Sequence, residues 1–204
     1  MTTSAAQPAS DRSDFRTVIG AGAKSGGVTA LAVVLFLVST RALPPGAVRS
    51  FAQALIALAT ALAAAFLPAR WAVPRTTEGV AGCAAIGLWG TIVFSAIDIA
   101  LFRPLKAYPW TWDAIGGGAT WWYLPMWWML GTYLAWMGGL RWAAMHARGE
   151  VTLGRAALPV VVGAALLAAV TTILRPGVPL PVAVGGGFAL TLTVLAVADV
   201  ARKR

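Results

Sequence analysis

The stretch at residues 79–102, GVAGCAAIGLWGTIVFSAIDIALF, decides the fold of this chain. Its 24 residues contain a single charged side chain, that of Asp98. A helix needs about 20 mostly apolar residues to cross the roughly 30 Å hydrocarbon core of a bilayer. The stretch therefore predicts a membrane-spanning helix.

Similar apolar runs lie on both sides of this stretch, separated by short links that carry Pro, Gly and Arg. The 204 residues are 59% hydrophobic and only 11% charged, whereas about a quarter of the residues in soluble domains are charged. We therefore predict an all-α, polytopic integral membrane protein, a compact bundle of six transmembrane helices that forms one domain over residues 25–204. The predicted spans are 26–43, 50–67, 79–102, 121–142, 156–174 and 180–200.

The basic residues predict the orientation of the bundle. Eleven Lys and Arg lie in the N-terminal tail, the second and fourth links and the C-terminus, and five lie in the other three links. By the positive-inside rule both termini are cytoplasmic, which predicts a multi-pass protein of the cytoplasmic (inner) membrane. Residues 1–24 are small and polar and predict a disordered cytoplasmic tail. The basic residues form no dense patch, so no nucleic-acid partner is expected.

The stretch at residues 108–136, YPWTWDAIGGGATWWYLPMWWMLGTYLAW, is the best candidate for function because it holds seven of the ten tryptophans. Four of the seven lie where the outer aromatic belt of a membrane protein is expected. Trp127, Trp128 and Trp136 lie deeper in the fourth span. They either fill space beside small residues or line a pocket for an apolar or cationic ligand, with Asp113 of the outer loop or Asp98 at its side.

Asp98 lies about one helical turn below the outer boundary of the third span. An acid inside a membrane is a functional hypothesis by default. A structural Asp98 would pair with Arg103 or Lys106, or accept an indole N–H from Trp127 or Trp128. A functional Asp98 would handle a proton or a substrate, and both interpretations stay open at this point.

Helix packing is predicted from small residues at four-residue spacing, Gly131-x-x-x-Ala135 and Gly139-x-x-x-Ala143, which let helix backbones approach closely in lipid. The segment at residues 20–25, GAGAKS, resembles a phosphate-binding loop in composition. It lacks the glycine that such a loop requires before the lysine, so we expect no nucleotide site there.

The predicted spans lack the histidine and cysteine groups that would bind a metal ion or a haem. The chain has one histidine, at the cytoplasmic end of the fourth span, and one cysteine, so we expect no metal and no cofactor. We therefore predict a non-enzymatic protein that contacts a partner subunit, a second copy of itself or a lipid-like ligand through the fourth span and the outer loop. The alternative is a small permease or exporter for an apolar or cationic solute, with Asp98 as the coupling acid.

Overall fold

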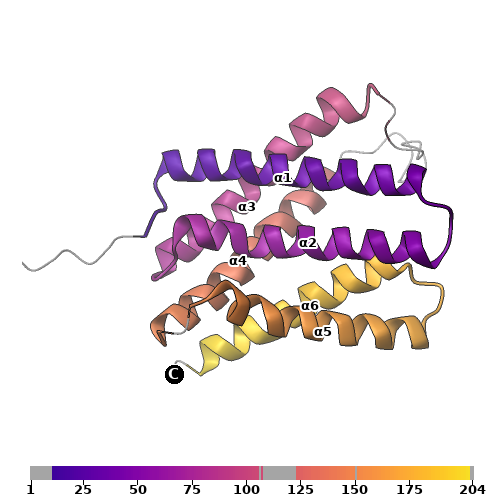
Figure 1. Cartoon of the computed structure of the whole chain (residues 1–204). Helices are drawn as coiled ribbons and strands as arrows, with labels where there is room; N and C mark the ends of the chain where they lie inside the picture. Colours follow the sequence, from indigo (N-terminus) through magenta and orange to yellow (C-terminus); the bar gives the residue numbers. More distant parts are fainter. Residues whose placement is uncertain (1–10, 106, 108–122, 150, 203–204) are drawn as a thin grey trace, which may run out of the picture.

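The computed structural model describes residues 11–105, 107, 123–149 and 151–202. Every regular element in these residues is a helix, which confirms the predicted all-helical fold (Figure 1). The helices are α1 (Phe15–Ala42), α2 (Ala47–Ala72), α3 (Thr77–Ile97) with its π-helical continuation η1 (Asp98–Phe102), α4 (Tyr123–Ala147), α5 (Leu153–Leu174) and α6 (Leu180–Ala201).

Five of these helices are long and apolar enough to cross a membrane: α1, α2, α3 with η1, α5 and α6. The helix α4, which the sequence predicts as the fourth span, does not reach that degree of hydropathy within the described residues. Its tryptophans, glycines and Arg141 lower its mean hydropathy, although it is 25 residues long. Five of the six predicted spans therefore coincide with helices that are long and apolar enough to cross a membrane.

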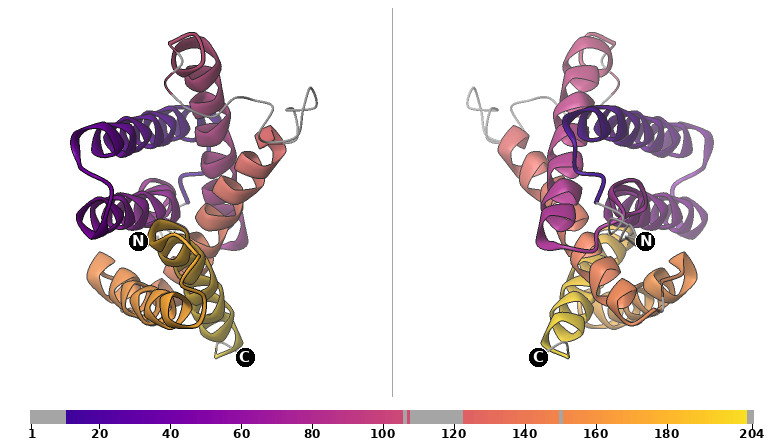
Figure 2. Two further views of the ribbon diagram at one scale, coloured as in Figure 1. Left: turned by 90° about the vertical axis from the view of Figure 1, so that its right-hand side faces the viewer. Right: turned by 90° about the vertical axis from the view of Figure 1, so that its left-hand side faces the viewer.

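The helices form three hairpins that run back and forth between two ends of the bundle (Figures 1 and 2). The start of α1 and the ends of α2, α4 and α6 lie at one end, on the left in Figure 1. The turns that join α1 to α2 and α5 to α6 lie at the other. Helix α2 is central, since it packs against α1, α3, α4 and α6. Its buried Ala65 and Phe66 meet Leu134 of α4 and Phe188 of α6 in the main core.

Glycines set the close contacts of α4. A Cβ at Gly131 would lie 2.2 Å from the methyl carbon of Thr91, and a Cβ at Gly139 would lie 3.0 Å from the Cβ of Cys83, both on α3. Gly138 faces α2, where a Cβ would lie 2.0 Å from the carbonyl oxygen of Ala65. The predicted packing role of Gly131 and Gly139 is confirmed, because no side chain fits at either position without a shift of its neighbours.

The first helix corrects the prediction for the N-terminus. Helix α1 begins at Phe15, so residues 15–24 are helical and the prediction of a disordered tail is wrong for them; residues 1–10 lie outside the described residues. The reason is packing. A Cβ at Gly22 would lie 2.5 Å from the Trp89 ring, and one at Gly26 would lie 2.7 Å from Val93. The segment that resembles a phosphate-binding loop is thus a contact surface between α1 and α3.

Asp11 fastens the chain before α1 to the turn between α2 and α3. Its carboxylate accepts hydrogen bonds from the N–H groups of Arg75, Thr76 and Gly79 at 2.9–3.1 Å and from the Thr76 hydroxyl. Burial raises the pKa of Asp11, but these hydrogen bonds outweigh burial and leave the pKa below its ordinary value of 3.8. Asp11 therefore acts as an additional cap at the N-terminus of α3.

The outer surface of the bundle is apolar. On α5, large aliphatic side chains at four-residue spacing are exposed, namely Leu158, Val162, Leu166 and Val170. Soluble proteins rarely expose a continuous apolar stripe of this kind. The stripe is compatible with a lipid bilayer around the bundle.

Candidate functional site

The N-terminal half of α4 is joined to α3 by its two adjacent tryptophans. The indole N–H of Trp128 donates to the hydroxyl of Ser95 at 3.3 Å, and Ser95 in turn donates to the carbonyl of Thr91. The ring of Trp127 lies edge-on against Phe94, with 5.9 Å between ring centroids. Of the partners considered for Asp98, Trp128 bonds elsewhere, because its N–H goes to Ser95, almost one helical turn earlier on α3.

Asp98 and Arg103 form the predicted ion pair. The Nε of Arg103 lies 3.2 Å from Oδ2 of Asp98, and Asp98 is only 5% exposed. In an α-helix, residues five apart point about 140° away from each other. The π-helical turn η1 changes this, because the N–H of Arg103 bonds to the carbonyl of Asp98 at 3.0 Å and the two side chains share one face. The π turn is therefore what allows this pair to form.

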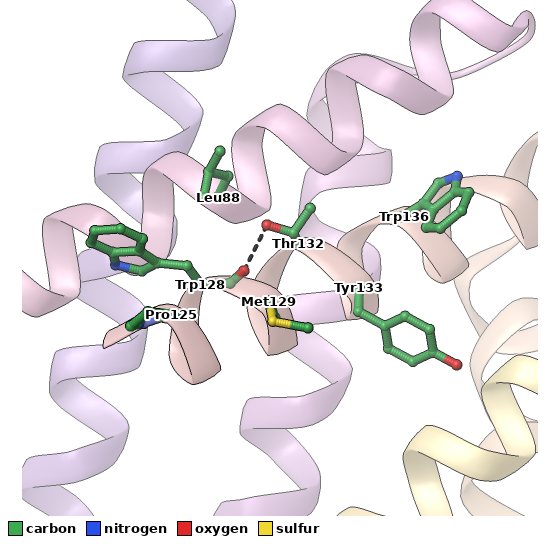
Figure 3. A pocket seen from close by; sticks show the side chains of 7 residues that line it. All are labelled: Leu88, Pro125, Trp128, Met129, Thr132, Tyr133 and Trp136. Carbon is green, nitrogen blue, oxygen red and sulfur yellow. Dashed lines mark hydrogen bonds between the residues drawn. The ribbon is translucent and has the colours of Figure 1, made fainter. Parts of the chain in front are cut away.

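A groove runs along the side of α4 that faces out of the bundle (Figure 3). Its volume is about 400 Å³. One wall comes from α3 and the rest from α4, at positions that repeat every three or four residues along one helix face. The lining side chains are Leu88, Pro125, Trp128, Met129, Thr132, Tyr133 and Trp136.

The hydroxyl groups of the groove are already bonded within the protein. Thr132 donates to the carbonyl of Trp128 at 2.6 Å. The Tyr133 hydroxyl shares a short hydrogen bond with Thr193 of α6, whose hydroxyl bonds to the carbonyl of Ala189. The groove therefore offers aromatic, aliphatic and thioether surface, and its two hydroxyls already have partners.

The predicted site residues fall into three places. Trp128 and Trp136 line the groove, and Trp136 is 44% exposed. Trp127, 39% exposed, packs against α3. Asp98 and Arg103 form their own pair at the C-terminal end of α3. Asp113 lies outside the described residues. The structure therefore brings together two of the three deep tryptophans, without a carboxylate among the groove residues.

A second charged group, absent from the predictions, lies at the opposite end of α4. Arg141 is 5% exposed and Asp199 of α6 is 6% exposed, and they form a short ion pair of 2.5 Å. Arg148 also contacts Asp199, at 2.9 Å. Arg141 further donates to the carbonyls of Ala156 and Arg155 at the start of α5. The signal in the sequence was an arginine inside one apolar run and an aspartate in the last turn of another.

The described residues hold no group of three or more His, Cys, Asp or Glu side chains that could bind a metal ion. The lining of the groove can contribute apolar and aromatic contacts, and the Asp98–Arg103 and Arg141–Asp199 ion pairs can fix helix positions. Comparison of the chain with models of protein families, with curated proteins and with solved structures finds no match.

Proposed function

We propose that the chain is a non-enzymatic, multi-pass membrane protein that holds the apolar chain of a lipid-like ligand in the α4 groove. The observation that carries this proposal is the composition of the groove: seven side chains offer apolar and aromatic surface, and both hydroxyls among them already have partners. The two hydroxyl hydrogens are already donated within the protein, so a polar solute finds no free hydroxyl donor among these side chains, whereas an apolar chain needs none.

The size of the groove favours a small ligand or a single lipid chain. Its volume of about 400 Å³ is near the lower limit for pockets that take small molecules. The groove opens sideways from the bundle, where a lipid chain can enter from the bilayer. Trp128 and Trp136 provide large flat surfaces on one helix, and Met129 adds an adaptable one.

We also propose that α4 crosses the membrane with the other five helices and that both termini are cytoplasmic. With 25 residues, α4 is about 37 Å long, which is longer than the hydrocarbon core. Its neighbours α2, α3 and α6 pack against it and supply apolar surroundings for a helix of modest hydropathy. The excess of Lys and Arg at the end that holds both termini favours that end as the cytoplasmic one.

The permease alternative receives no comparable support. A coupling acid must be reached by water and must change its protonation state. Asp98 is 5% exposed and ion-paired with Arg103, and this geometry favours an acid that holds the end of α3 in place. Transport coupled to Asp98 is therefore the second hypothesis, to be tested with Asp98→Asn.

The proposal is tested by native mass spectrometry of the protein purified in mild detergent. We expect lipid-sized adducts on the wild type and fewer on Leu88→Trp, which fills the groove without removing a hydrogen bond. The matched control is Leu55→Trp, in a second apolar groove of about 330 Å³ between α1 and α2. A wild type without adducts, or equal loss in both variants, contradicts the proposal. A copurified protein subunit in place of lipid would identify a partner helix as the occupant.

A further inference from the structure

We propose that the arginines around Asp199 form a binding site for the headgroup of an anionic phospholipid at the basic end of the bundle. Three helix ends meet there, the C-terminal ends of α4 and α6 and the N-terminal end of α5 (Figure 1). The inference rests on the proposed membrane location, and it concerns a site separate from the α4 groove.

The inner part of this site is a fixed ion pair. Arg141 bonds to Asp199 and to two carbonyls of α5, so its guanidinium joins α4, α5 and α6. Both side chains are more than nine-tenths buried. Asp199 therefore has one carboxylate oxygen bound by Arg141 and offers the other to Arg148 at 2.9 Å. This second contact holds the partly exposed Arg148 at the rim.

The outer part of the site is basic. Arg155 and Arg202 are exposed and are not among the hydrogen-bond partners of Asp199. Arg202 follows Asp199 by three residues at the end of α6 and so lies on the same side of that helix. Arg155 is held close by the bond from Arg141 to its carbonyl. Asp199 contacts Arg141 and Arg148, and Arg155 and Arg202 lie at the adjoining helix ends. In residues 141–155 and 199–202 these four arginines outnumber the two acids, Glu150 and Asp199, which leaves a net positive charge at the junction of the three helices.

An anionic phospholipid matches this surface in two ways. Its phosphate complements the net positive charge, and arginine binds phosphate oxygens in a two-pronged geometry. Its acyl chains would lie along exposed apolar side chains of the adjoining α5, such as Leu153 and Leu158. Basic pockets between helices on the cytoplasmic side of a membrane bind anionic headgroups for these reasons. Free phosphate shares the first match and lacks the second.

The test compares two double variants that remove the same charge from the same end of the bundle. Arg155→Gln/Arg202→Gln changes the proposed site and leaves the Asp199 ion pairs intact. Arg12→Gln/Arg70→Gln is the control, since both arginines are exposed at that end but belong to α2 and the segment before α1. Binding of phosphatidylglycerol, phosphatidylcholine and inorganic phosphate to the protein in neutral detergent is measured by native mass spectrometry.

We expect the wild type to bind phosphatidylglycerol in preference to phosphatidylcholine. Each arginine near an anionic headgroup is worth about a fivefold change in affinity. The site variant should therefore bind about 25-fold more weakly, and the control less than twofold. Equal losses in both variants, or no preference for phosphatidylglycerol, would overturn the proposal. Displacement of the lipid by millimolar phosphate would also overturn it, because the ligand would then be the free anion. Lipid adducts that disappear with Leu88→Trp and persist in the site variant would place the lipid in the α4 groove and would overturn the arginine site alone.

Discussion

The contact between Gly87 of α3 and Gly131 of α4 holds the groove wall against its floor, and Gly87→Ala tests it. A Cβ at Gly87 would lie 2.5 Å from the carbonyl oxygen of Gly131 and 2.6 Å from the Cβ of Ala135. Ordinary contacts of a Cβ begin at 3.4 Å, so the two helices must separate by roughly 1 Å.

The size of the effect follows from two opposing contributions. Alanine in place of glycine stabilises a helix interior by about 1 kcal/mol. Overpacking costs about 1–3 kcal/mol, and the upper half of that range applies here because the obstructing oxygen belongs to the backbone of α4 and has no rotamer to change. We therefore expect Gly87→Ala to lower the free energy of unfolding by about 1–2 kcal/mol.

The control is the same substitution at Gly27 of α1, where nothing lies within 4 Å of the added Cβ. Gly27→Ala should raise stability by up to about 1 kcal/mol. Unfolding of both variants in mixed micelles, titrated with a denaturing detergent and followed by circular dichroism, gives the comparison. If Gly87→Ala is as stable as Gly27→Ala, the close approach of α3 and α4 is not what holds the groove.

Three further predictions concern the polar contacts. Asp199→Ala should lower the free energy of unfolding by about 3–5 kcal/mol, because it leaves Arg141 buried without its carboxylate partner. The double variant Asp199→Leu/Arg141→Met should lower it clearly less. Equal losses in the unfolding titration would contradict this prediction. Because the pKa of Asp11 is lowered, its hydrogen bonds stabilise the fold fully above pH 3.8 and progressively less as the pH falls through the lowered pKa. In that acidic range, protection of the N-terminal segment from hydrogen exchange should fall in the wild type and not in Asp11→Asn. Parallel pH profiles of the two proteins would contradict this prediction. Trp128→Phe and Ser95→Ala should each cost about 0.5–1.5 kcal/mol for the lost hydrogen bond, and a double variant that costs their sum would show that the two side chains are not coupled.

Five of the helices in the described residues were predictable because each contains a long apolar run, whereas α4 is less apolar and was predicted from a run rich in tryptophan. The start of α1 was not predictable. Residues 15–24 contain glycines and charges, a composition that predicts a disordered tail. In the structure, however, Gly22 lies against Trp89, which is far away in the sequence. Tertiary packing thus extended a helix that local propensity and hydropathy did not favour.

The candidate site was predictable in part for a similar reason. Depth in the fourth span selected Trp127, Trp128 and Trp136, and two of these, Trp128 and Trp136, line the groove. The pairing of Asp98 with Arg103 depends on a π turn that no spacing rule for α-helices contains. Arg141 and Asp199 each stand out as a charge within an apolar run, but they are 58 residues apart, and nothing in either run names the other as its partner. Only the packing of α4 against α6 makes them a pair.

The most direct test of lipid binding in the α4 groove uses a phosphatidylcholine with a photoactivatable group on its acyl chain. The protein is labelled in bilayers that contain this lipid, and the labelled peptides are mapped by mass spectrometry. Binding in the groove predicts labels concentrated between Pro125 and Trp136 and reduced several-fold by Leu88→Trp. Labels spread evenly over exposed faces such as that of α5, and unchanged by Leu88→Trp, would contradict the proposed function.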